Sequence, residues 1–146
     1  MDSIRELLQE KRFRPLCITH PGMTVLEATQ LMNNERIGAL LVMHDSKLIG
    51  IFTERDVLRR VVADGRQPEA TLVAEVMTDD IISCEPDASV EEVADTMRRL
   101  RIRHVPVVTR SGSVDGLVSI GDIIAHQFNH SEAALHQVED YIHRRS

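Results

Sequence analysis

An internal repeat constrains this chain more than any other feature. Residues 20–25 match residues 85–90 at an offset of 65, and the offset becomes 66 by the glycine pair Gly50 and Gly116. The second copy has one extra residue in the hairpin around Arg110–Ser113. Each copy has about 60 residues, a size at which a lone core is marginally stable. We therefore expect two similar units that pack on each other face to face.

Both copies carry the same short motif, Gly-apolar-apolar-[Ser/Thr]-x-x-Asp. It runs from Gly50 to Asp56 and again from Gly116 to Asp122. The apolar residues predict the end of a buried strand, the hydroxyl residue is a good helix N-cap, and the Asp falls in the first helical turn. Such a corner offers backbone N–H groups and a hydroxyl to a phosphate or ribose, and its carboxylate suits a sugar diol. One copy alone would more often be an ordinary capped helix, but two equivalent copies favour a site.

Hydrophobic periodicity and capping residues predict the same order of elements in both copies, namely short helix, strand, helix, strand, strand, helix. The expected elements are residues 3–11, 16–19, 24–34, 39–43, 48–52 and 54–63, then 71–77, 81–84, 89–100, 105–108, 114–118 and a final helix from about 120 toward 144. The apolar residues expected to face inward from helix 54–63 are Val57, Leu58, Val61 and Val62.

The final helix carries an apolar stripe with heptad-like spacing. Its members are Ile124, Phe128, Leu135, Val138 and Ile142. The stripe fits packing against a second copy of the chain and packing on its own domain equally well, so both interpretations stay open.

Composition narrows the possible partners. The net charge is −6, no long basic run occurs, and aromatic residues make up 3% of the chain. These features argue against nucleic acid or an anionic membrane as the main partner. The first residues are polar, and no apolar run approaches the roughly 20 residues of a membrane span. We expect a soluble, cytoplasmic protein in which Cys17 and Cys84 are buried free thiols.

No set of catalytic residues is evident. The sequence contains no P-loop, no Gly-x-Gly-x-x-Gly and no nucleophile elbow. Glu27, Glu91 and Glu92 fall in first helical turns, where capping explains them. Cys17 and Cys84 fall in apolar strands, which would raise a thiol pKa. The sequence therefore predicts a protein that is not an enzyme.

Two histidines stand four residues apart on the final helix, a spacing that metal ligands use. These are His126 and His130, with Glu132 and His136 nearby in the sequence. Because the sequence fixes no third ligand beside them, we expect a solvated, weakly basic helix face and no metal site.

The repeated β-α-β-β-α order with these motifs resembles a pair of CBS domains, a Bateman module of the small stand-alone bacterial type. The resemblance covers essentially the whole chain, and its supporting stretches are Arg36–Val42, Ala74–Thr78, Arg103–Val108 and the two motif copies. It implies an α/β (α+β) fold of two tandem repeats packed by pseudo-two-fold symmetry, with a short N-terminal helix and a long C-terminal helix. Residues 1–66 would form the first repeat and residues 67–146 the second.

This resemblance implies a non-catalytic regulatory module that binds AMP, ADP or ATP in clefts between the repeats. Some relatives bind NAD(H) or S-adenosylmethionine, and paired modules commonly form a homodimeric disc. The expected partners are thus an adenine nucleotide, a second CBS pair and a regulated protein that the sequence does not identify. Two alternatives stay open, a structural adaptor that dimerises through its C-terminal helix and a sensor of S-adenosylmethionine.

The resemblance also implies a role for each motif. The Asp is expected to hold the ribose hydroxyls, the Ser or Thr to bond ribose or phosphate, and the other repeat to cradle the adenine. Because Gly38 and Ala39 stand where the second repeat has Arg103 and His104, the cleft served by those two basic residues is expected to bind phosphate more tightly. The first cleft draws on Thr53, Arg55, Asp56, Thr78, Ile81, Arg103 and His104, the second on Ser119, Asp122, Arg12 and Ile18, and Pro106, Gly38 and Ala39 complete the set.

Overall fold

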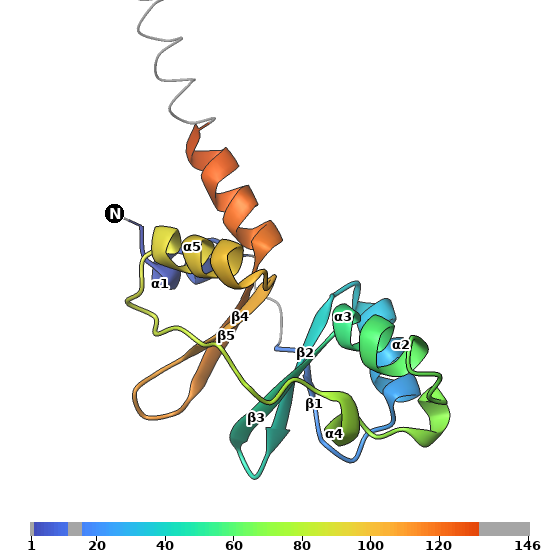
Figure 1. The fold of residues 1–146 in the computed structure, drawn as a ribbon. Coiled ribbons are helices and arrows are strands. Elements are labelled where there is room, and N and C mark those ends of the chain that lie inside the picture. Colours follow the sequence, from blue (N-terminus) through green and yellow to red (C-terminus); the bar gives the residue numbers. More distant parts are fainter. Residues whose placement is uncertain (1, 12–15, 132–146) are drawn as a thin grey trace, which may run out of the picture. The chain divides into compact units, whose positions relative to one another are not determined.

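The computed structural model describes residues 2–11 and 16–131. The chain forms two compact units (Figure 1). Unit 1 groups Met1–Arg14, Cys84–Val107 and Asp115–Ser146, and unit 2 groups Pro15–Ser83 and Val108–Val114. Among the described residues, no helix combines the length and the apolar character that crossing a membrane requires.

A three-stranded sheet organises unit 2. The strands β1 (Ile18–Thr19), β2 (Ala39–His44) and β3 (Lys47–Thr53) lie in that order, with β1 parallel and β3 antiparallel to β2. Helix α2 (Val25–Glu35) begins where the Thr24 side chain accepts from the Glu27 N–H, as the predicted cap requires. The buried core of the unit consists of Val25, Ala28, Met32, Leu40, Val42, Phe52, Val61, Val73 and Val76.

The chain after β3 is helical, although not in the predicted form. Helix α3 (Glu54–Asp56) runs directly into the π-helix η1 (Val57–Val62). A 3-10 turn, η2 (Pro68–Ala70), and helix α4 (Val73–Val76) follow. The prediction that four apolar residues of 54–63 face inward was partly wrong, because Leu58 and Val62 are 62% and 63% exposed. The core covers the side of the helix that carries Val61 and leaves the adjacent apolar stripe open.

Unit 1 combines helices from both ends of the chain with a two-stranded sheet. Helices α1 (Ile4–Glu10) and α5 (Val90–Leu100) are capped by Ser3 and Ser89, and β4 (His104–Val108) pairs with β5 (Val114–Ser119). The predicted strand 81–84 was wrong, since its one sheet contact is a bridge from Cys84 to Val107. The buried core consists of Ile4, Leu7, Val90, Val93, Met97, Val105, Val107, Val118 and Ile123.

A C-terminal helix follows β5 and is described over residues 120–131. His126 on this helix is 4% exposed, so the predicted solvated histidine face was wrong at this residue. Of the apolar stripe, Ile124 and Phe128 are 59% and 64% exposed. Its remaining members, residues 135, 138 and 142, lie outside the described residues.

The short helices pack across the sequence repeats. In unit 1, the Ile4 N–H of α1 donates to the Ala88 carbonyl at 2.8 Å, although α1 precedes the first repeat's strands. In unit 2, the Val73 N–H of α4 donates to the Met23 carbonyl at 2.9 Å. Each unit thus contains the short helix that precedes the strands of the other repeat in the sequence, and Figure 1 shows α1 beside α5. The predicted boundary between residues 66 and 67 separates the two sequence repeats and stays a prediction. The two packed units are divided differently, because each contains segments from both repeats.

Candidate functional site

Asp56 is fixed inside the corner between β3 and α3. Its Oδ2 accepts from the Thr53 N–H at 2.9 Å, and the Thr53 hydroxyl oxygen accepts from the Asp56 N–H at 3.3 Å, which makes a reciprocal capping box. Its Oδ1 accepts from the Thr78 hydroxyl at 3.0 Å and lies 3.8 Å from Arg60 Nε. Asp56 is 5% exposed. The structure therefore brings together three predicted site residues, Thr53, Asp56 and Thr78, within one unit.

The glycine of the motif allows Thr78 to reach this corner. The backbones of Ile51 and Thr78 exchange two hydrogen bonds of 2.9 Å, which bring the segment after α4 against β3. A Cβ on Gly50 would lie 2.6 Å from Met77 Sδ and 3.0 Å from the Thr78 carbonyl oxygen. A side chain at this position would therefore push the segment that carries Thr78 away from Asp56.

Replacing Gly50 by alanine is expected to lower the free energy of unfolding by about 1–3 kcal/mol, because the added methyl overpacks a site with backbone on one side. The matched control is Gly116→Ala, whose Cβ would meet the end of the Leu8 side chain at 2.9 Å. Since a leucine end can rotate away, we expect a loss below about 1 kcal/mol there. Urea unfolding of both variants measures the difference, and equal losses would contradict the role of the Thr78 backbone.

The second motif repeats the cap with a different partner for its carboxylate. The Ser119 N–H donates to Asp122 Oδ2 at 2.8 Å, and the Asp122 N–H donates to the Ser119 hydroxyl at 3.1 Å. Where unit 2 has Thr78, unit 1 has Lys11, whose Nζ donates to Asp122 Oδ2 at 2.8 Å and to the Leu117 carbonyl at 3.0 Å. The side chain of Asp122 is 21% exposed, against 6% for Asp56.

Sequence reasoning missed Lys11. The basic residue predicted beside the second motif was Arg12, which lies outside the described residues. Lys11 could have been found in the sequence, because it is the basic C-cap residue of α1 and directly precedes Arg12.

Gly38 and Arg103 occupy equivalent places in the two units. The Gly38 carbonyl accepts from the Glu54 N–H at 3.0 Å, and the Arg103 carbonyl accepts from the Ile120 N–H at 2.8 Å. Arg103 is exposed, and its backbone thus adjoins the motif of its own unit. The assignment of Arg103 and His104 to the ligand of Asp56 joins residues of two units and stays a prediction.

The other predicted ligand residues differ in position and burial. Arg55 is exposed on α3, Ile18 is 47% exposed on β1, and Pro106 is buried in β4. Ile81 lines an open hollow beside the β2–β3 hairpin. Ala39 does lie opposite Thr53 in the register of β2 and β3, so it adjoins the first motif. Arg12 lies outside the described residues.

The two cysteines differ from reactive thiols in burial. Cys17 and Cys84 form no disulfide with a described residue, and both are half-buried rather than buried as predicted. Burial raises the pKa of the Cys84 thiol to about 11. Since the thiolate is the reactive form, Cys84 is protonated and inert near neutral pH.

Comparison with known proteins gives the same family for both repeats. The CBS domain family model matches residues 4–63 and 73–129. The CBS domain-containing protein YhcV of Bacillus subtilis (strain 168) is 34% identical over 113 residues, which cover 77% of this chain and 79% of YhcV. The mitochondrial CBS domain-containing protein CBSX3 of Arabidopsis thaliana is 35% identical over 124 residues, which cover 82% of this chain and 60% of CBSX3. The chain thus matches less than two thirds of the length of CBSX3.

Solved structures of CBS proteins share the fold. The CBS domain protein NE2398 matches with a TM-score of 0.82 and 36% identity, over 87% of this chain and 98% of its own. PAE2072 from Pyrobaculum aerophilum, complexed with AMP, matches with a TM-score of 0.72 and 26% identity, over 82% and 88%. The CBS domain pair of MJ0100, in complex with 5′-methylthioadenosine and S-adenosyl-L-methionine, matches with a TM-score of 0.76 and 25% identity, over 90% and 98%. Two family matches, one on each sequence repeat, and this shared fold show that the chain belongs to the CBS domain family as a tandem CBS pair.

Proposed function

We propose that this CBS pair is a non-catalytic regulatory module that binds adenine nucleotides through Asp56 and Asp122. The observation that carries the proposal is the duplicated corner, in which a Ser or Thr cap fixes the rotamer of an inward-held carboxylate. A carboxylate accepts from two adjacent hydroxyls at once, as a ribose diol requires. AMP, 5′-methylthioadenosine and S-adenosylmethionine, the ligands of the two similar structures, all contain such a diol beside adenine.

The two carboxylates should bind ribose with different strength. A ribose at Asp56 has to share Oδ1 with the neutral Thr78 hydroxyl, whereas a ribose at Asp122 has to compete with the Lys11 ammonium. Hydrogen bonds between charged groups are stronger than those from a neutral hydroxyl. We therefore assign the tighter site to Asp56, and Arg103 and His104 are our candidates for its phosphate contact.

We include a homodimer in this proposal, because both units leave equivalent apolar residues open. Leu58 and Val62 in unit 2 correspond, at the repeat offset, to Ile124 and Phe128 in unit 1. All four side chains are at least 59% exposed. Isolated exposed apolar residues are common, but the same pair at equivalent positions in both repeats favours a shared interface. A second candidate function is an adaptor that uses these faces without binding a nucleotide.

Calorimetric titration with a ligand panel tests the proposal. The panel contains AMP, ADP, ATP, NAD(H) and S-adenosylmethionine, with 2′-deoxy-AMP as the matched control. Loss of one hydrogen bond to a charged group costs about 1.5–3 kcal/mol, so we expect 2′-deoxy-AMP to bind roughly 10- to 100-fold more weakly than AMP. A dimer that binds none of the panel would support the adaptor instead.

Native mass spectrometry of freshly purified protein complements the titration, since it gives the oligomer size and any co-purified ligand. Incubation with AMP or ATP followed by product analysis tests the absence of catalysis. A changed nucleotide would contradict the non-catalytic part of the proposal.

A further inference from the structure

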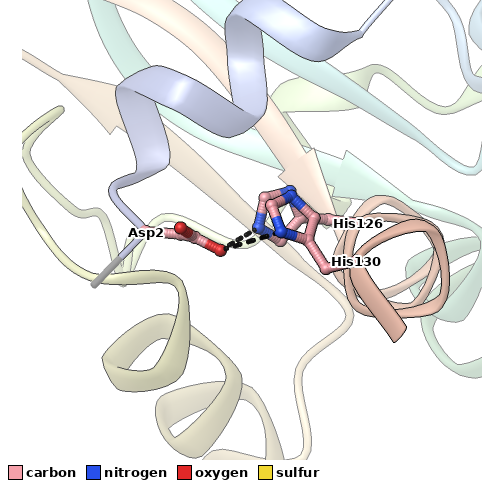
Figure 2. Close-up of side chains that lie close together, drawn as sticks. All are labelled: Asp2, His126 and His130. Carbon is pink, nitrogen blue, oxygen red and sulfur yellow. Dashed lines mark hydrogen bonds and ion pairs between the residues drawn. The ribbon is translucent and has the colours of Figure 1, made fainter. Parts of the chain in front are cut away.

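A second cluster of ionisable side chains lies in unit 1 and shares no residue with either motif. It joins Asp2 at the start of the chain and Glu10 at the end of α1 to His126 and His130 on the C-terminal helix. Figure 2 shows the Asp2 carboxylate directed at both imidazole rings. The ligand atoms of Asp2, His126 and His130 all lie within 4.8 Å of one another.

The spacing of these atoms is close to that around a small metal ion. Asp2 Oδ2 is 2.8 Å from His126 Nε2 and 3.6 Å from His130 Nδ1. Bonds of about 2.0–2.2 Å in a tetrahedral zinc site place neighbouring ligand atoms roughly 3.3–3.5 Å apart. Asp2 Oδ2 thus already lies near this spacing from both rings, and side-chain adjustment would let the three atoms surround one ion.

The Glu10 carboxylate contacts the ring nitrogen of each histidine that faces away from Asp2. Its Oε2 lies 2.6 Å from His126 Nδ1, and its Oε1 lies 3.2 Å from His130 Nε2. A carboxylate there can accept an N–H from each imidazole, so that a metal that displaces the proton shared with Asp2 would meet His126 Nε2 and His130 Nδ1 as free ligand atoms. Histidines that bind metals are commonly oriented in this way by a carboxylate on the far nitrogen.

The charge of the cluster and its exposure to solvent are also consistent with a metal site. The hydrogen bond from His126 lowers the pKa of Asp2 and also that of Glu10, so both carboxylates are anionic at neutral pH. Burial opposes a charged imidazole, but hydrogen bonds to Glu10 and Asp2 outweigh it and raise the pKa of His126, so a proton competes with a metal here. The side chains of Asp2 and His130 are 42% and 50% exposed, which leaves room for a water ligand.

We propose that Asp2, His126 and His130 form a binding site for a divalent transition metal of the zinc type, with Glu10 orienting both imidazoles and water as the fourth ligand. Imidazole nitrogen favours zinc, cobalt and nickel, whereas magnesium and calcium prefer oxygen. A bound ion would tie the first residues and α1 to the C-terminal helix. The site is independent of nucleotide binding.

Metal titration of the full chain tests this site after removal of bound metal with a chelator. We expect Zn²⁺ to bind at one ion per chain by calorimetry and Co²⁺ to give the visible absorption bands of a tetrahedral site. Neither Mg²⁺ nor Ca²⁺ should bind. Lowering the pH should weaken Zn²⁺ binding, because a proton must leave His126.

Three variants and two controls locate the ion. His130→Ala is expected to weaken Zn²⁺ binding at least 100-fold, and Glu10→Gln by roughly 10- to 100-fold through lost orientation of the rings. Asp2→Asn removes the anionic ligand with little change of shape. The controls are His44→Ala, an exposed histidine of unit 2, and His136→Ala, beyond the described residues; neither should change Zn²⁺ affinity.

Unchanged Zn²⁺ binding in His130→Ala would overturn the site, and so would an equal loss in a control. If the native chain binds no Zn²⁺ at 100-fold excess, the cluster is a proton-bridged ion pair instead. Zn²⁺ should also raise the melting temperature of the native chain but not that of His130→Ala. Far-UV circular dichroism and urea unfolding of His130→Ala confirm that the variant is folded.

Discussion

Replacing Asp56 by alanine is expected to abolish the tighter of two AMP-binding events. A carboxylate that accepts from both ribose hydroxyls contributes two charge-assisted hydrogen bonds, each worth about 1.5–3 kcal/mol. Their loss corresponds to an affinity at least 100-fold weaker, which calorimetry with AMP measures directly. Asp122→Ala is the matched control, because it removes the equivalent carboxylate and should leave the tighter event in place.

This substitution also removes an internal contact, so stability must be followed alongside binding. Without the carboxylate, the Thr53 N–H and the Thr78 hydroxyl lose their acceptor. We expect the free energy of unfolding to fall by about 1–3 kcal/mol. Asp56→Asn separates the two effects, since the amide oxygen still accepts from the Thr53 N–H while one ribose acceptor is lost. If Asp122→Ala removes the tighter event and Asp56→Ala leaves it, the assignment of the sites is reversed.

Replacing Phe128 by glutamate is expected to convert the proposed homodimer into monomers at micromolar concentration. Phe128 is 64% exposed, next to Ile124 on the same helix face. An aromatic anchor at an interface contributes about 2–4 kcal/mol, and a two-fold dimer contains the substitution twice. We therefore expect the dimer dissociation constant to rise at least 100-fold, as measured by sedimentation velocity.

The matched control for this change is Leu100→Glu. Leu100 lies in the same unit and is 44% exposed, but it ends α5 and has no counterpart in the repeated pair. It should leave the dimer intact. A Phe128→Glu protein that sediments like the native chain, or a Leu100→Glu protein that dissociates equally, would argue against the apolar faces as the interface.

Local sequence signals predicted most of the elements. The caps Ser3, Thr24 and Ser89 each begin a helix where expected, because a cap is a contact between residues three apart. The runs that became β2, β3, β4 and β5 were found for a similar reason, since short stretches rich in apolar residues and bounded by turn residues predict strands. The reciprocal contacts of Thr53 with Asp56 and of Ser119 with Asp122 also lie within one turn.

The predictions that were wrong depend on which other segments pack against each helix or strand. Leu58 and Val62 have the periodicity of a buried stripe, yet both are exposed. The periodicity of a helix does not indicate how much of its apolar face the rest of the unit covers. The segment 81–84 is apolar, yet a strand needs a partner along its length and only Cys84 has one. The exchange of α1 and α4 between the repeats has no local signature, because both short helices fit either core by composition.

The sequence by itself determined the repeat, the family, the capped corners and the two carboxylates that end them. Only the tertiary structure decided that Lys11 pairs with Asp122, 111 residues away, and that Asp2 meets His126, 124 residues away. The reason is physical. Caps and apolar periods act over a few residues of backbone geometry, whereas these contacts arise when burial of separate apolar faces brings distant segments together.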